Sequence, residues 1–125
     1  MLATSLLSLH TALELVAGSL LIVRGKGSLE ANTTPSAKAK LYRRWHGAGL
    51  LALSGLGALV LARGQSHGEV GRTAFIVLTG FHSVAFGVHL LAAVEGESDL
   101  TVSFKEALLS PHLVLAAGMA VHLAR

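Results

Sequence analysis

The sequence contains no cysteine, which excludes disulfide bonds, thiolate metal sites and cysteine nucleophiles. Charged residues make up only 14% of its 125 residues, and aromatic residues only 5%. A soluble domain of this length would need far more charge to cover its surface. With 52% hydrophobic residues and 14 glycines, the composition instead favours helices that pack closely within lipid.

Several enzyme signatures are also absent from the sequence. There is no Gly-x-Ser-x-Gly elbow, no P-loop and no dinucleotide-binding fingerprint. The formal net charge is +3, but no basic patch is interleaved with aromatic residues, so no nucleic-acid partner is expected. The basic residues are better explained by membrane topology, with membrane lipids as neighbours.

Four apolar segments predict a single membrane domain, residues 1–125, with an all-α fold: a four-helix transmembrane bundle of up-down topology. About 20 apolar residues span the hydrocarbon core at a rise of about 1.5 Å per residue. The predicted spans are residues 2–23, 45–62, 73–94 and 107–124. No Lys or Arg precedes the first span, so we expect a retained helix rather than a signal peptide.

The basic residues of the connections predict the orientation of the bundle. The first and third connections hold seven: Arg24, Lys26, Lys38, Lys40, Arg43, Arg44 and Lys105. The second connection and the C-terminus hold three: Arg63, Arg72 and Arg125. The positive-inside rule therefore places the first and third connections in the cytoplasm and both termini on the opposite side of the membrane.

Small residues follow one stripe of the second span: Gly47, Ser54, Ala58 and Ala62. Such a stripe allows two helix backbones to approach closely. We expect it to pack against the first or third span, because a compact bundle needs such a face. The alternatives are a homodimer through this helix or contact with a partner membrane subunit.

Polar residues inside the spans are the main functional signal. Glu14 is the only acidic residue within a span, and a charge near mid-bilayer costs roughly 2.5–3.5 kcal/mol or more. His10 lies one turn before it on the same face. His82 is expected at a similar depth in the third span, with His112 close by in the fourth. His89 shares the face of His82, nearly two turns further on.

Two functional classes follow from this polar layer. The first is a membrane subunit or scaffold that binds a lipophilic cofactor, haem b or a quinone, among the intramembrane histidines. His10, His82, His89 and His112 are its candidate cofactor-binding residues, and His82 with His112 the candidate ligands of haem iron. The second class is a small membrane enzyme in which Glu14 and His82 perform acid–base chemistry on a lipid or isoprenoid substrate.

Two further interpretations concern the same side chains. A non-haem metal site of His and Glu ranks last among the chemical ones, because no His-x-x-x-His or Glu-x-x-His pair occurs. The structural interpretation is that the histidines are hydrogen-bonding contacts between helices. It is preferred for His46 and His122, which lie near the predicted interfaces.

The layout resembles the DoxX-like superfamily of small four-helix membrane proteins. The features that carry the resemblance are Gly18 in the first helix, Pro35 in the loop, and Arg44-Trp45-His46-Gly47 leading into Leu50-Leu51-Ala52-Leu53. The resemblance implies a four-helix bundle, and it implies no particular activity, because functions in this superfamily are diverse. The histidine content departs from the pattern. A four-spanning scaffold of sterol synthesis shares the layout but no specific motif.

Overall fold

The computed structural model describes residues 2–25, 36–95 and 111–124, apart from the side chains of His89, Ala92, Ala93 and Glu95. Within these ranges the chain forms four α-helices joined to short turns and ends. They are α1 (Leu2–Arg24), α2 (Ala37–Ala62), α3 (Gly68–Glu95) and α5 (Pro111–Leu123). The prediction of an all-α fold is confirmed for the described part of the chain.

The helices differ from the predicted spans mainly where they begin. The second helix starts at Ala37 rather than at residue 45, because Ser36 caps it: the Ser36 hydroxyl accepts a hydrogen bond from the Ala39 N–H at 3.1 Å. The third helix starts at Gly68 rather than at residue 73. Pro111 opens α5 as described, where its missing N–H does no harm, and residues 107–110 of the predicted fourth span lie outside the described residues.

Three helices are long and apolar enough to cross a membrane: α1, α2 and the Gly68–Val88 part of α3. The fourth, α5, is apolar but has 13 described residues. Large apolar side chains cover the outside of the helices, and Val23, Val84 and Val114 are each more than 60% exposed. A soluble protein would bury such side chains, so these surfaces are consistent with an integral membrane protein.

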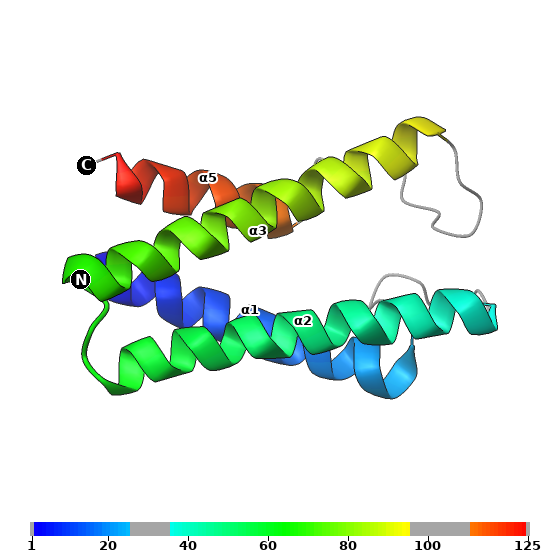
Figure 1. Ribbon diagram of the computed structural model, residues 1–125, viewed down its shortest axis with the longest axis horizontal. Coiled ribbons are helices and arrows are strands. Elements are labelled where there is room, and N and C mark those ends of the chain that lie inside the picture. Colours follow the sequence, from blue (N-terminus) through cyan, green and yellow to red (C-terminus); the bar gives the residue numbers. More distant parts are fainter. Residues whose placement is uncertain (1, 26–35, 96–110, 125) are drawn as a thin grey trace.

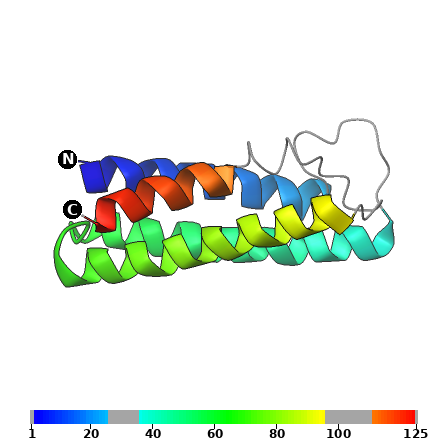
Figure 2. The same cartoon turned by 90° about the horizontal axis from the view of Figure 1, so that it is seen from above.

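Figure 1 shows the helices as two pairs, α1 beside α2 and α3 beside α5, with the N- and C-termini at the same end of the molecule. The closest packing lies within these two pairs, and α2 with α3 and α1 with α5 complete the ring of neighbours. The view in Figure 2 shows α1 and α5 in one layer and α2 and α3 in the other. Each helix therefore turns one face toward the centre of a four-helix bundle.

The α1–α2 pair is held together by backbone proximity. A Cβ atom placed on Gly18 would lie 2.8 Å from the Gly47 carbonyl oxygen, and one on Gly47 would lie 2.8 Å from the Gly18 oxygen. A Cβ on Gly57 would collide with the Thr11 hydroxyl. The Ser54 hydroxyl donates a hydrogen bond to the Thr11 carbonyl at 2.9 Å. Only glycine permits this crossing, and one hydrogen bond reinforces it.

This pair decides how the small-residue stripe of α2 is used. Gly47 and Ser54 are buried against α1, which confirms the prediction of packing within the bundle. Ala58 and Ala62 are exposed, and Gly57 takes the buried position instead. The predicted stripe was therefore wrong in its second half, because the contact follows positions 47, 50, 54 and 57. A homodimer through α2 stays a prediction.

An apolar core fills the end of the bundle at which both termini lie. Its buried members come from all four helices: Ala3, Leu7, Val60, Ala74, Phe75, Leu78, Leu115 and Met119. At this end α2 and α3 are joined by the short turn Arg63–His67, where Gly64 has a φ of 65° that favours glycine. The hydroxyls of Thr4 and Ser66, 2.9 Å apart, connect the turn to α1. The polar residues lie beyond this core.

Candidate functional site

The inward face of α1 contributes the first two polar residues. Its buried positions are Ala3, Leu7, His10, Glu14 and Gly18, spaced by three or four residues as one helical face requires. His10 is completely buried and Glu14 is 3% exposed. A carboxyl group and an imidazole therefore occupy adjacent turns in the middle of a helix whose other faces are apolar.

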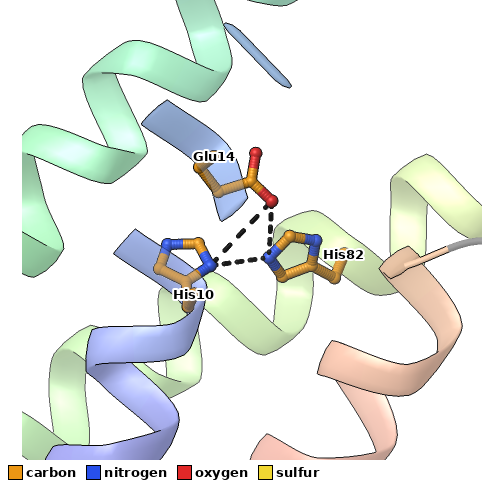
Figure 3. A group of neighbouring side chains, drawn as sticks. All are labelled: His10, Glu14 and His82. Atoms are coloured by element: carbon orange, nitrogen blue, oxygen red, sulfur yellow. Dashed lines mark hydrogen bonds and ion pairs between the residues drawn. The ribbon is translucent and has the colours of Figure 1, made fainter. Parts of the chain in front are cut away.

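Helix α3 brings His82, also completely buried, against this pair. His82 Nε2 lies 3.1 Å from His10 Nδ1 and 3.5 Å from Glu14 Oε1. His10 Nδ1 and Glu14 Oε1 are 4.0 Å apart. Figure 3 shows the three atoms at the corners of a triangle, with His82 reaching in from its own helix. Two nitrogens and one oxygen thus converge on a single point between α1 and α3.

Helix α5 adds His112, which is 8% exposed. His82 Nδ1 and His112 Nδ1 are 2.9 Å apart, a hydrogen bond in which one of the two nitrogens carries the proton. Both nitrogens of His82 are thus engaged, one by His112 and one by the α1 pair. His112 fixes the ring orientation of His82, as outer partners of metal-binding histidines commonly do.

His46, on α2, lies at the edge of this cluster. Its ring centroid is 5.9 Å from that of His112, and its ring stacks on Phe81 with an interplanar angle of 19°. From the sequence, His46 is expected near the membrane interface, apart from the polar layer. Its predicted depth alone did not indicate a contact with His112. Such a contact also depends on how α2 is rotated about its axis, which one sequence does not determine.

The other candidate residues are placed as follows. Ser54 contacts the backbone of α1 rather than the imidazoles. His122 packs on Phe75 in the apolar core at a centroid distance of 4.6 Å, in agreement with its structural interpretation. The side chain of His89 lies outside the described residues. The histidines that the structure brings together are therefore His10, His82 and His112, with His46 alongside.

The cluster also contains a polar atom that no described residue satisfies. Glu14 Oε2 is buried and has no hydrogen-bond partner among the described residues. An unpaired buried polar group costs about 1–3 kcal/mol, and a charged one costs more. The buried carboxyl group of Glu14 therefore either stays protonated or has a cation beside it, which could be a metal ion or a protonated imidazole.

The triangle has the dimensions of a metal site. Ligand atoms bonded to one metal at about 2.1 Å lie ~3.0–3.4 Å apart in octahedral or tetrahedral geometry. The separation of 3.1 Å lies within this range and that of 3.5 Å just above it, and a rotation of the Glu14 carboxyl could shorten the third separation of 4.0 Å. Two imidazoles and one carboxylate form a set that binds transition metals and leaves coordination positions open.

The same dimensions do not suit haem. Two axial nitrogens on opposite faces of an iron lie about 4 Å apart, with the porphyrin between them. His82 and His112 instead touch through nitrogens 2.9 Å apart, and His82 and His10 through nitrogens 3.1 Å apart. No space for a macrocycle separates either pair, so haem would bind only after the helices had moved apart.

Comparisons with protein-family models, with curated proteins and with solved structures found no match. The resemblance to the DoxX-like superfamily therefore stays a prediction. A functional assignment has to come from the geometry of this chain's own residues.

Proposed function

We propose that this protein is an integral membrane protein with four spans in up-down order. The three long apolar helices and the apolar side chains on their outer surfaces support this proposal. The fourth span would be α5 with the residues that precede it. The excess of Lys and Arg places the first and third connections in the cytoplasm, and both termini on the other side.

Within this bundle, His10, Glu14 and His82 bind a divalent transition-metal ion. The observation that carries the proposal is the convergence of three ligand atoms from two helices within 4.0 Å of one another. The ion supplies the positive charge that a buried Glu14 carboxylate requires. A mixed nitrogen and oxygen set suits zinc or ferrous iron, and His112 holds His82 in the orientation that directs Nε2 to the ion.

Metal analysis tests this proposal directly. The protein is purified in detergent without chelator, and its metal content is measured by mass spectrometry for the wild type, Glu14→Gln and His122→Gln. His122 is the matched control because it is a histidine of the same bundle that packs outside the cluster. We expect stoichiometric zinc or iron in the wild type and in His122→Gln, and its loss in Glu14→Gln.

Wild-type protein that stays metal-free after incubation with zinc and with ferrous iron would contradict the metal assignment. So would a Glu14→Gln protein that retains the full metal content. Size-exclusion chromatography of each variant in detergent shows whether the bundle is intact, so that loss of the metal is not confused with loss of the fold.

An acid–base enzyme is the second candidate function, favoured by the 3.5 Å contact between His82 Nε2 and Glu14 Oε1. A carboxyl group and an imidazole at that distance, shielded from water, could transfer a proton to or from a lipid or isoprenoid substrate. This function becomes the better account if the folded protein binds no metal and Glu14→Gln abolishes turnover of such a substrate.

The cofactor interpretation with haem b or a quinone has its own test. A visible spectrum of the purified protein, oxidised and then reduced, would show a Soret band if haem were bound. A band that is lost in His112→Ala would support haem and would mean that the helices separate to admit it. Extraction of the purified protein with organic solvent would reveal a bound quinone.

A further inference from the structure

A second feature lies where the end of α1 meets the first turns of α2. Ile22, Leu41, Arg44, Trp45 and Ala48 line an open groove of about 290 Å³. Its walls are almost entirely apolar, and the charged group at the site is the Arg44 guanidinium. The groove is therefore a shallow apolar surface with a cation beside it.

Arg44 is held in place at this groove. Its Nε donates a hydrogen bond to the Ile22 carbonyl at 3.2 Å, which is among the last carbonyls of α1 and has no partner within the helix. This bond uses one of the five N–H donors of the guanidinium. This contact orients the exposed guanidinium, which lowers the entropic cost of binding a phosphate oxygen.

The surroundings of Arg44 are strongly basic. Arg24 ends α1, and Lys38, Lys40 and Arg43 share the first turns of α2 with Arg44, whereas Glu14 is the only acidic residue in the described segments 2–25 and 36–48. Trp45 is 71% exposed and Tyr42 is 60% exposed, with the Lys38 ammonium 5.8 Å above the Tyr42 ring. Exposed aromatic and basic residues together are typical of the headgroup region of a membrane.

We propose that this groove binds an anionic phospholipid of the surrounding leaflet. The lipid phosphate bonds to Arg44, and the first part of one acyl chain lies in the groove along Leu41 and Ala48. The local charge favours an anionic lipid over a zwitterionic one. A second copy of this chain is disfavoured as the occupant, because it would bring two basic clusters together.

The inference rests on the proposed membrane insertion but is independent of the metal site. Trp45 is the only tryptophan in the sequence and lines the groove, so its fluorescence reports on the occupant directly. The full-length protein is reconstituted into phosphatidylcholine vesicles that contain brominated phosphatidylglycerol or, at the same mole fraction, brominated phosphatidylcholine. Bromine on the acyl chains quenches a tryptophan that they contact.

We expect stronger quenching of Trp45 by the brominated anionic lipid, with a preference of roughly fivefold in relative affinity. Arg44→Gln should abolish most of this preference, and Arg44→Lys should keep part of it. Arg63→Gln, at the opposite end of α2, is the matched control and should leave the preference unchanged.

Equal quenching of the wild type by the two brominated lipids would overturn the proposal, whatever the variants do. An unchanged preference in Arg44→Gln would overturn the role of Arg44. Flotation of the protein with pure phosphatidylcholine vesicles measures insertion separately. Protein that fails to float with these vesicles would contradict the membrane assignment itself, whereas protein that floats without a lipid preference contradicts only the lipid site.

Discussion

The α1–α2 crossing and the histidine cluster are two ways in which this small protein joins its helices. At the crossing, glycines let backbones touch, with Gly18 and Gly47 opposite one another. At the cluster, long polar side chains bridge α1, α3 and α5 around Glu14. The crossing tolerates few substitutions, and its glycines offer no group that could bind a ligand. The cluster leaves Glu14 Oε2 without a partner among the described residues and holds groups that can bind a ligand.

This difference indicates that the two regions have different roles, one in stability and the other in ligand binding. Close packing of small residues is an effective source of stability in lipid, where the hydrophobic effect does not drive helices together. Buried ionisable groups stabilise a fold poorly when they lack a partner, and apolar residues of similar size often do as well. We therefore expect substitutions at the crossing to affect folding, and substitutions in the cluster to affect ligand binding.

The largest effect is expected from Gly47→Val. The new Cβ would lie 2.8 Å from the Gly18 carbonyl, and a backbone atom cannot move away without separating the helices. We expect destabilisation of about 3 kcal/mol or more, measured as a lower midpoint of thermal unfolding in detergent. Gly49→Val is the control, because a Cβ at Gly49 meets nothing within 4 Å. Equal midpoints for the two variants would show that the crossing does not determine stability.

Glu14→Met should separate stability from ligand binding. In metal-depleted protein we expect it to unfold at or above the wild-type temperature, because an unsatisfied carboxyl is replaced by an apolar side chain. With free zinc or iron at about a hundredfold above the dissociation constant, the wild type alone should gain about 2.7 kcal/mol. A metal-depleted variant that is strongly destabilised would mean that Glu14 is a structural residue instead.

His112→Gln tests whether α5 contributes to the proposed metal site by orienting His82. His112 contacts His82 rather than the converging ligand atoms, so the metal should still bind but more weakly. We expect a loss of about 10- to 100-fold in metal affinity, measured by competition with a chromophoric chelator. His122→Gln, on the same helix, should bind the metal as the wild type does. Complete loss of binding in His112→Gln would make His112 a direct ligand.

Ser54→Ala should have the smallest effect. The Ser54 hydroxyl donates one hydrogen bond to the Thr11 carbonyl, and hydrogen bonds between membrane helices contribute about 0.6 kcal/mol on average. The thermal midpoint should fall only slightly, with no change in metal content. A loss as large as that of Gly47→Val would show that the hydrogen bond, rather than the glycine contact, holds the α1–α2 pair.

Much of the fold could be predicted from hydropathy, because the rise of a helix and the thickness of lipid together set the length and depth of each span. This is why Glu14, His82 and His112 could be assigned to one polar layer from sequence alone. The depth of a residue in the membrane does not determine how its helix is rotated about its own axis, however. Ala58 was expected on the packing face and Gly57 was found there, and a single residue corresponds to about 100° around a helix.

The proposed metal site could not be favoured from the sequence, for a related reason. The search for His-x-x-x-His or Glu-x-x-His pairs assumes that one helix supplies most of the ligands. Here α1 supplies His10 and Glu14 with that same separation of four residues, and the third ligand atom comes from His82, 72 residues from His10 in the sequence. Only the assembly of the bundle, in which α1 and α3 face one another across its centre (Figure 2), brings it into reach, and a single sequence does not contain that information.

The length of α2 bears on the depth at which the His10, Glu14 and His82 group would lie in a membrane. Its 26 residues measure about 39 Å, whereas the hydrocarbon of a bilayer is about 30 Å thick. The excess lies in the first turns, which carry Lys38, Lys40, Arg43 and Arg44 and must remain in the headgroups. Displacing the bundle along the membrane normal would move these charges into the hydrocarbon core or move Trp45 out of the headgroup region. In the proposed membrane arrangement, α2 would therefore fix the depth of the His10, Glu14 and His82 group relative to the aqueous phase.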